Sequence, residues 1–277
     1  MDKEVVMKNV VYLNDKGQKL QQLKKAQVRH VAAMLTEKLA EWPSYDRDDL
    51  QVFLSYEQTG PDFGIELCRE VTRDMPHLTP DSFFPAISGS EGTYTVSYVK
   101  NDHSSKAFSY FSQAESAVAH VATSYAACCE DVSEGEADAC ILPLYTGKDG
   151  ILTSFCALAE EHGLAVHSLL RIEMPHTEDF TLFGLMRPQC EYVKGARYLA
   201  FAIHEELLGR FGSVLSALKA YGAAPVKLGT VSLGKEFGGF LTLCVADVLN
   251  ANLSALLLYL ELFFPSYIAF GFFDLPE

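Results

Sequence analysis

The chain has 277 residues and a mass of 30.6 kDa, which suits two domains or three small ones at roughly 100–200 residues per domain. Apolar residues make up 49% of the sequence and charged residues 21%, so the composition is that of a globular protein and excludes wholesale disorder. Asp and Glu number 36 against 22 Lys and Arg, which gives a net charge of −14. Because such a field repels nucleic acid and anionic membranes on average, neither is expected as a partner.

The seven cysteines are odd in number and irregularly spaced, which does not fit a disulfide framework and favours a reducing compartment. Near the start of the chain lies an apolar run of three residues, Val5 to Met7, which is too short for a signal peptide. The most apolar stretch, 253–260, is followed by Glu261 and falls short of the about 20 residues that a bilayer helix needs. These features predict a cytoplasmic protein without a membrane segment.

Residues 1–93 are predicted to form an α/β region of unassigned role that could stand in for a lobe of a larger domain. Leu20, Leu23, Val31 and Leu35 recur near a 3.6-residue period, which indicates a helix. A stretch rich in Pro, Ser and Gly then predicts a loop or linker. The expected strands are 10–13 and 50–56, the expected helices are 18–41 and 62–75, and the expected loop is 79–90.

Residues 94–190 alternate between short apolar runs and helical patterns. Strand and helix in alternation imply crossover connections and a largely parallel sheet. The expected strands are 94–99, 117–122, 140–144, 164–172 and 181–186, and the expected helices are 104–111, 124–134 and 151–162.

Residues 196–277 are predicted to fold in the order βαββαβ, which is a split-βαβ or ferredoxin-like unit. Only 12 of these residues are Asp, Glu, Lys or Arg, which is few for a small unit with a large surface for its volume. We therefore expect another domain or subunit to cover part of the surface, as in a homodimer or higher oligomer. The expected strands are 197–204, 226–233, 240–246 and 267–273, and the expected helices are 212–221 and 252–264.

This last region resembles an ACT domain, a small regulatory fold that binds amino acids. Its segment Phe211-Gly-Ser-Val-Leu-Ser-Ala-Leu218 stands where the ACT domains of prephenate dehydratases have Pro-Gly-Ala-Leu-x-x-Ala-Leu. A glycine lets the backbone approach a ligand closely, and the helix that follows offers free N–H groups to a carboxylate. The resemblance implies an amino-acid site at Gly212, Ser213 and Val214. It leaves open whether the ACT fold binds a ligand or serves only for dimerisation.

The middle region resembles the first lobe of a prephenate dehydratase. Residues 130–150 contain a helix end, a Gly-x-Ala-Asp turn and an apolar strand reaching Pro143, and residues 176–180 fall where the family has Asn-x-Thr-Arg-Phe. An ACT domain is what usually follows in that family. The resemblance implies an α/β fold, with a parallel-sheet, prephenate dehydratase-like region of the periplasmic-binding type at 94–190 and a ferredoxin-like βαββαβ ACT domain at 196–277.

The sequence departs from the family at both of its site motifs. The Glu-Asn-Ser loop has become Tyr145-Thr146-Gly147, and Thr-Arg-Phe has become Glu178-Asp179-Phe180. The resemblance gives the lost threonine the departure of the prephenate hydroxyl and the lost arginine a carboxylate contact, so that Asp179 is expected to repel the dianion. The family's second lobe is also missing before this motif. The candidates that remain are Thr177 and Lys148 for catalysis, and Tyr145, Thr146 and Glu178 for ligand binding.

Two functions follow from these observations. The first is a non-catalytic, regulatory relative that binds an amino acid or a prephenate-like acid and is linked to aromatic amino-acid metabolism. The alternative is an active prephenate dehydratase, which converts prephenate to phenylpyruvate, water and carbon dioxide. No metal site is expected, since the histidines and cysteines show no ligand spacing, and no cofactor is expected, since no glycine-rich nucleotide motif follows a strand.

Overall fold

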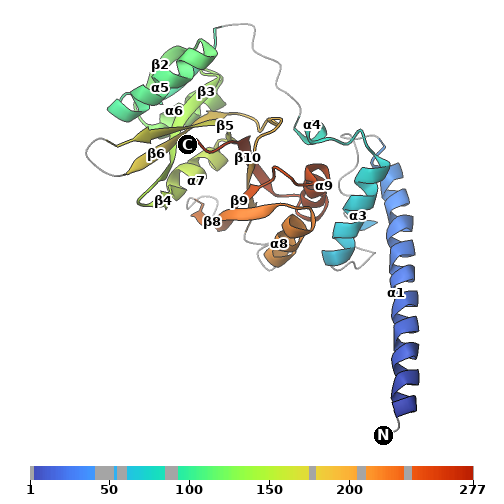
Figure 1. Cartoon of the computed structure of the whole chain (residues 1–277). Coiled ribbons are helices and arrows are strands. Elements are labelled where there is room, and N and C mark those ends of the chain that lie inside the picture. The colour runs from blue at the N-terminus through green and yellow to red at the C-terminus, as the bar shows by residue number, and fades with distance from the viewer. Residues whose placement is uncertain are drawn as a thin grey trace. The chain divides into compact units, whose positions relative to one another are not determined.

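The structure, a computed structural model, describes residues 3–40, 53–54, 61–84, 93–174, 179–204, 210–233 and 239–276. The chain divides into two compact units, Met1–Thr79 and Pro80–Glu277, which Figure 1 draws in blue to cyan and in cyan to red. No helix among the described residues combines the length and the apolar character that crossing a membrane requires.

The first unit is built on the long helix α1 (Lys3–Lys38), which packs against α3 (Pro61–Asp74). The predicted helices at 18–41 and 62–75 are therefore confirmed, but the strand expected at 10–13 is wrong, because these residues continue α1. A short apolar run is ambiguous between strand and helix, and here the helix continues through it. Of the strand expected at 50–56, residues 53 and 54 are helical, and the others lie outside the described residues. The buried side chains include Val31 and Leu35 of α1, Leu39 directly after it, and Leu67 and Val71 of α3.

The second unit contains one sheet of ten described strands in the order β2-β1-β3-β6-β5-β10-β7-β9-β8, with β4 paired to β3. The predicted elements of residues 94–277 are present within a few residues of their expected bounds. The strands are β1 (Thr95–Val99), β2 (Val118–Ala122), β3 (Ala139–Thr146), β4 (Gly150–Ile151), β5 (Ala165–Glu173), β6 (Phe180–Arg187), β7 (Tyr198–His204), β8 (Ala224–Ser232), β9 (Phe240–Asp247) and β10 (Ile268–Phe273). The helices are α4 (Pro80–Phe83), α5 (Asp102–Glu115), α6 (Tyr125–Ser133), α7 (Thr153–Glu161), α8 (Phe211–Ala220) and α9 (Leu253–Phe263).

The first half of this sheet is an α/β layer with helices on both faces. Strand β1 runs parallel to β2 and β3, as predicted, but β6 runs antiparallel to both β3 and β5. The expectation of a largely parallel sheet thus holds for β2-β1-β3 only, because the connection from β5 to β6 is too short for the crossover that parallel strands need. Apolar side chains of α5 pack with β1 on one face, whereas α6 and α7 cover the other.

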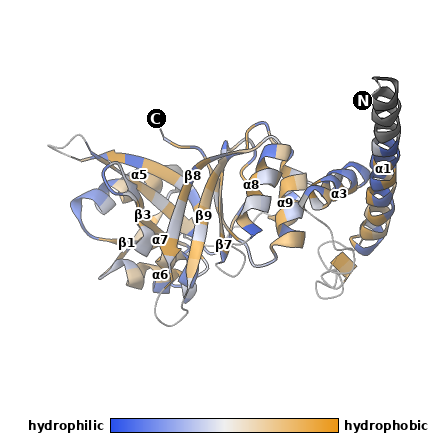
Figure 2. Ribbon diagram, turned by 90° about the horizontal axis from the view of Figure 1, so that it is seen from below, coloured by the Kyte–Doolittle hydropathy of each residue, from blue (hydrophilic) through white to orange (hydrophobic). Residues whose placement is uncertain are grey.

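The second half is a ferredoxin-like unit. Its strands lie in the order β10-β7-β9-β8 and pair antiparallel throughout, which is the arrangement that the βαββαβ pattern predicts. Helix α9 is almost wholly buried, with Leu256, Leu257 and Leu260 fully inaccessible, and Figure 2 shows it largely in the hydrophobic colour. A helix that is apolar on nearly all sides belongs to a core rather than to a surface.

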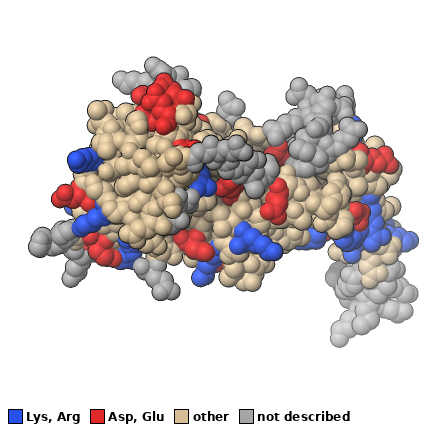
Figure 3. Space-filling model, turned by 90° about the horizontal axis from the view of Figure 1, so that it is seen from above, with Lys and Arg blue, Asp and Glu red and all other residues tan. Residues whose placement is uncertain are grey.

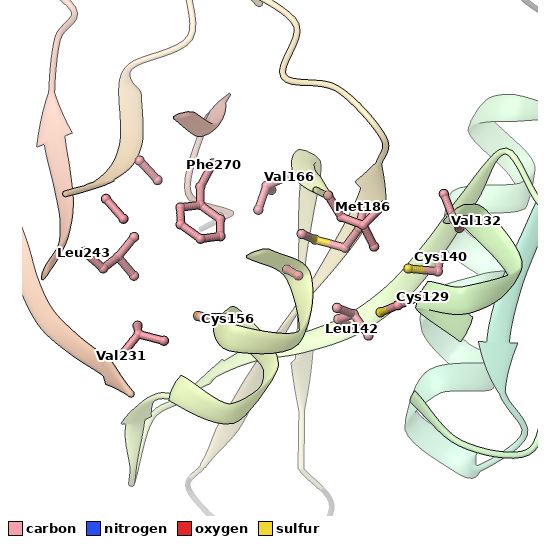
Figure 4. Close-up of a cluster of buried hydrophobic side chains, with 14 of the residues drawn as sticks. Cys129, Val132, Cys140, Leu142, Cys156, Val166, Met186, Val231, Leu243 and Phe270 are labelled. Atoms are coloured by element: carbon pink, nitrogen blue, oxygen red, sulfur yellow. The ribbon is translucent and has the colours of Figure 1, made fainter. Parts of the chain in front are cut away.

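The two halves join where β10 lies parallel to β5, with Gly271 opposite Val166. Gly271 has a φ of +147°, and a Cβ atom on it would lie 2.2 Å from the Val166 carbonyl oxygen. Only glycine fits so close a backbone approach at such a φ. Helix α7 of the first half also contacts β8 of the second. The sheet and α7 therefore enclose a common apolar interior, to which both halves contribute (Figure 4).

Candidate functional site

A cavity of about 340 Å³ lies in this shared interior. Its described walls come from β3 to β6 and α7 on one side, from β7 to β10 on the other, and from the segment after β10. Figure 4 shows side chains from both halves turned toward one another in this region. The deeper walls are aliphatic and aromatic, and include Val166, Met186, Leu243, Phe270 and Phe273. A cavity of this volume lies at the lower end of the roughly 300–1,000 Å³ of small-molecule sites.

Two basic side chains and two aromatic rings lie together at one place in the cavity lining. We call this group the cationic rim, and it comprises Tyr145, Arg171, Phe180 and Lys227. The Lys227 Nζ atom donates to the Tyr145 hydroxyl at 3.1 Å and lies 4.4 Å from the centre of that ring. The Arg171 guanidinium lies 3.9 Å from the centre of the Phe180 ring, which stacks on Tyr145 at 5.9 Å. Two cations are thus held over two stacked rings, each contact contributing about 0.5–1 kcal/mol at an exposed site.

A shift in strand register precedes each of two residues of the cationic rim, Tyr145 and Lys227. The register of β3 against β6 shifts between Pro143 and Tyr145, and the register of β8 against β9 shifts between Pro225 and Lys227. Proline cannot donate to a ladder, so within a sheet it favours a bulge or an edge, and a bulge re-aims the side chains that follow it. The same local device therefore precedes both members of the Lys227–Tyr145 pair.

Of the residues predicted for this loop, Tyr145 lines the cavity. Thr146 instead holds its own turn, since its hydroxyl donates to Asp149 at 3.1 Å and accepts the Asp149 amide at 2.9 Å. The Lys148 side chain is exposed, and neither it nor Thr146 is among the described lining residues. Thr177 and Glu178 lie outside the described residues.

Asp179 stands where the family has its arginine, and its carboxylate serves the loop. The Oδ1 atom accepts the backbone amides of Lys148 at 3.0 Å and Phe180 at 2.8 Å. A Cβ atom on Gly147 would lie 2.5 Å from the same oxygen, so the glycine makes room for it. The described lining of the cavity does not include Asp179. The carboxylate therefore has a structural role in the loop, and the expected repulsion of a bound anion by this residue stays a prediction.

The cations of the site are Arg171 on β5 and Lys227 on β8, and neither was predicted from the sequence. Each is a single basic residue inside an apolar strand, between Leu170 and Ile172 in one case and between Val226 and Leu228 in the other. An isolated charge in such a run is the signal that could have found them, since it interrupts the apolar pattern of the strand.

The predicted amino-acid site lies elsewhere in the unit. Gly212, Ser213 and Val214 form the first turn of α8, and they do not belong to the described lining of the cavity. Val214 is fully buried, so its side chain serves the core. The space where a Cβ atom of Gly212 would lie is open. An amino-acid site on this turn stays a prediction.

Groups able to transfer protons are scarce in the cavity. Burial raises the pKa of the Cys156 thiol to about 11, so this side chain keeps its proton near neutral pH. The described lining carries no carboxylate and no histidine. Histidine and the carboxylates are the most frequent general acids and bases, and the described walls hold neither.

A second cluster of ionisable groups lies on the α6 side of the sheet, away from the cavity lining. His120, Asp131 and Glu136 each have one side-chain atom that could bind a metal ion, and these atoms all lie within 4.8 Å of one another. His120 Nε2 is 3.5 Å from Asp131 Oδ2, and the buried Ser97 hydroxyl donates to the same oxygen at 2.5 Å. These contacts account for Asp131 as a structural carboxylate.

No protein-family model matches the chain, and no curated protein sequence matches it either. Solved structures do resemble it. Prephenate dehydratase from Streptococcus mutans has 15% identity and a TM-score of 0.52, over 65% of this chain and 98% of that one. Prephenate dehydratase from Arthrobacter aurescens, solved in complex with L-Phe, has 14% identity and a TM-score of 0.51, over 65% and 90%. GqqA, described as a novel type of quorum-quenching acylase, has 16% identity and a TM-score of 0.50, over 67% and 97%. The predicted prephenate dehydratase-like α/β fold is thereby confirmed.

Proposed function

We propose that the protein is a non-catalytic, ligand-binding relative of the prephenate dehydratases, linked to aromatic amino-acid metabolism. The ligand is a small carboxylic acid with an apolar side chain, and it occupies the cavity between the two halves of the sheet. The observation that carries the proposal is the cationic rim at an otherwise apolar cavity. Such a cavity matches a molecule with one anionic end and one apolar end.

The rim has donors for a carboxylate. A lysine ammonium has three donors, and the Tyr145 hydroxyl takes one of those on Lys227. The Arg171 guanidinium gives Nε to Glu173 at 2.6 Å, and its two amino groups carry four further N–H donors. Hydrogen bonds between charged partners are about twice as strong as neutral ones. A carboxylate placed between the two cations would therefore be held in a fixed position.

Binding without turnover fits the same residues. Loss of a hydroxyl from prephenate needs a general acid, and removal of one preorganised donor typically costs about 100- to 1,000-fold in rate. The described walls supply Cys156, whose pKa of about 11 makes it a poor acid. An active enzyme is the alternative, and it would depend on Thr177 and Lys148.

Titration calorimetry with the unmodified protein tests the binding. Phenylpyruvate, prephenate, phenylalanine and acetate form the panel, and at least one of the first three is expected to bind, whereas acetate is not. At a hundredfold excess over its Kd, the ligand should raise the unfolding free energy by about 2.7 kcal/mol. Lys227→Met should weaken binding at least fivefold, while Lys106→Met, a change of an exposed lysine outside the described lining, should not. Equal loss in the two variants would contradict the proposed site.

The assay for catalysis measures the absorbance of phenylpyruvate in base after incubation with prephenate. We expect no turnover above background. Turnover on the order of 1–1,000 per second, the ordinary enzymatic range, would establish the alternative. Thr177→Val and Lys148→Met would then identify the residues on which it depends.

We further propose that the ferredoxin-like half is an ACT-like domain through which the cytoplasmic protein forms a homodimer or a higher oligomer. Strand β8 lies at an edge of the sheet and exposes Val226 and Leu228, and Phe240 of the neighbouring β9 is also exposed. On the face drawn in Figure 3, broad areas carry no charged side chain. Exposed edges with apolar side chains favour pairing with another chain. Light scattering should give at least twice 30.6 kDa, and a monomer at micromolar concentration would contradict this.

A further inference from the structure

We infer that the ligand of the cavity is a carboxylic acid without an amino group, so that the site selects against amino acids. The inference rests on the proposed function and concerns the same cavity. It departs from what the ACT resemblance implies, because an ACT domain is expected to bind an amino acid. The charges, hydrogen-bond acceptors and apolar side chains of the described walls decide which groups of a ligand can bind.

The first step is the charge of the lining. Among the described lining residues, the side chains charged at neutral pH are Arg171 and Lys227, and both are cations. The described lining contains no acidic side chain, and burial raises the pKa of the Cys156 thiol to about 11. An α-ammonium lies within a few bonds of its carboxylate, so a bound amino acid would bring a third positive charge beside these two. Like charges at such short range repel.

The second step is the supply of acceptors for an ammonium. Asp179, which directly precedes β6, accepts the backbone amides of Lys148 and Phe180 and is not part of the described lining. Glu173 pairs with Arg171 at 2.6 Å, and its side chain is 66% exposed. Strands β3, β6 and β9 are paired on both sides, so most of their backbone carbonyls serve the sheet. None of the described lining side chains carries a negative charge, so an ammonium at the rim would find no charged partner there.

The third step is the size and chemistry of the deeper walls. Phe270, Phe273 and Leu243 face Val166 and Met186 across the interior. These side chains suit an apolar group, and Met186 offers a thioether that contacts aromatic edges favourably. A cavity of about 340 Å³ has room for one ring with a short acid chain and little more. The chemical class is therefore a small aryl or branched aliphatic monocarboxylate.

Three compounds with the same ring separate the effects of the two charged groups. 3-Phenylpropionate carries the carboxylate alone, L-phenylalanine carries carboxylate and ammonium, and phenethylamine carries the ammonium alone. Titration calorimetry on the unmodified full chain should give the lowest Kd for 3-phenylpropionate, a Kd at least tenfold higher for L-phenylalanine, and no binding of phenethylamine. This comparison needs no variant, so it does not depend on how a substitution affects folding.

Two variants at the rim complete the test. Lys227→Met should raise the Kd of 3-phenylpropionate at least fivefold, and Lys227→Glu should narrow or reverse the preference over L-phenylalanine, because it supplies the acceptor that the site lacks. Lys106→Met, at an exposed lysine outside the described lining, is the matched control and should leave both values unchanged.

If L-phenylalanine binds as tightly as 3-phenylpropionate and needs Lys227, the inference is overturned while the proposed ligand site stands. If neither acid binds, or if Lys227→Met changes neither Kd, the proposed function itself fails and the inference fails with it. Binding of phenethylamine would also overturn the inference, because it would reveal an ammonium site.

Discussion

The ammonium of Lys227 donates to the hydroxyl of Tyr145 at 3.1 Å across 82 positions of sequence. Tyr145 lies near the end of β3 in the first half of the sheet, and Lys227 lies on β8 at the far edge of the second half. The pair therefore joins two strands that are not neighbours in the sheet and that α7 contacts. The cationic rim exists only when both halves are folded against each other.

Tyr145→Phe removes the hydroxyl but keeps the ring under Lys227. We expect the free energy of unfolding to change by about 0.5–1.5 kcal/mol, the contribution of one hydrogen bond, and the Kd of 3-phenylpropionate to rise about two- to fivefold as Lys227 loses one anchor. Tyr145→Leu also removes the ring beneath the ammonium and the stacking on Phe180, and should cost more in both measurements. Identical results for the two variants would mean that the ring contributes nothing.

Asp179→Arg restores the residue type of the family motif, yet we expect it to destabilise the protein. The backbone amides of Lys148 and Phe180 would lose their shared acceptor, at a cost of about 1–3 kcal/mol. Asp179→Asn is the matched control, because its amide oxygen can still accept, and it should cost less. Chemical denaturation measures both.

The prephenate assay is the second measurement on Asp179→Arg. No activity is expected, because the described cavity walls still lack a suitable acid. A stable Asp179→Arg protein with prephenate turnover would contradict the structural role that we assign to this carboxylate.

Local sequence patterns were enough to predict most elements of residues 94–277, because each element there has a clear period and a turn or cap at its end. Asn101, for example, accepts the amides of His103 and Ser104 at the start of α5. The strand expected at 10–13 failed because a short apolar run is ambiguous between strand and helix. The antiparallel β5–β6 pair was missed because alternation alone was taken to imply crossovers.

The site was predicted in part for a physical reason. Tyr145 was found because it lies in a motif that is continuous in sequence. Arg171 was missed because its proximity to Tyr145 depends on the antiparallel pairing of β6 with β3 and β5. Lys227 was missed because its proximity depends on the β5–β10 junction, which no local pattern encodes. The junction itself depends on one close approach, that of Gly271 to Val166. A glycine in a strand signals such an approach without saying what it meets.

Alkaline pH should destabilise the protein through its buried thiols. Burial raises the pKa of Cys156 from its ordinary 9.0 to about 11. Because the folded state holds this proton more tightly than the unfolded chain, the stabilisation is fully present below pH 9 and is lost as the pH rises toward 11. The loss from this group is on the order of 2 kcal/mol.

Cys156→Val removes the titrating group while keeping an apolar side chain of similar size. Its unfolding free energy is measured by denaturant titration between about pH 8 and about pH 11, a range that includes the ordinary and the raised pKa of this thiol. It should fall less steeply with pH than that of the unmodified protein. Cys128, whose pKa burial raises to about 11, and Cys190 and Cys244, whose pKa values burial raises to about 12, remain in both proteins and contribute to the fall that is left. Parallel curves would show that Cys156 does not contribute.

Gly271→Ala should be among the most damaging single changes in the second unit. A Cβ atom there would lie 2.2 Å from the Val166 carbonyl oxygen, and the φ of +147° is one that other residues rarely adopt. Backbone strain and overpacking each cost about 1–3 kcal/mol, so a loss of about 2–6 kcal/mol is expected. Gly212→Ala is the control, because the space at its Cβ is open and alanine favours a helix by up to about 1 kcal/mol.

Gly271→Ala should also weaken binding of 3-phenylpropionate, since moving β10 away from β5 displaces Phe270 and Phe273 from the cavity wall. A Gly271→Ala protein with unchanged stability would mean that β5 and β10 do not approach so closely in solution.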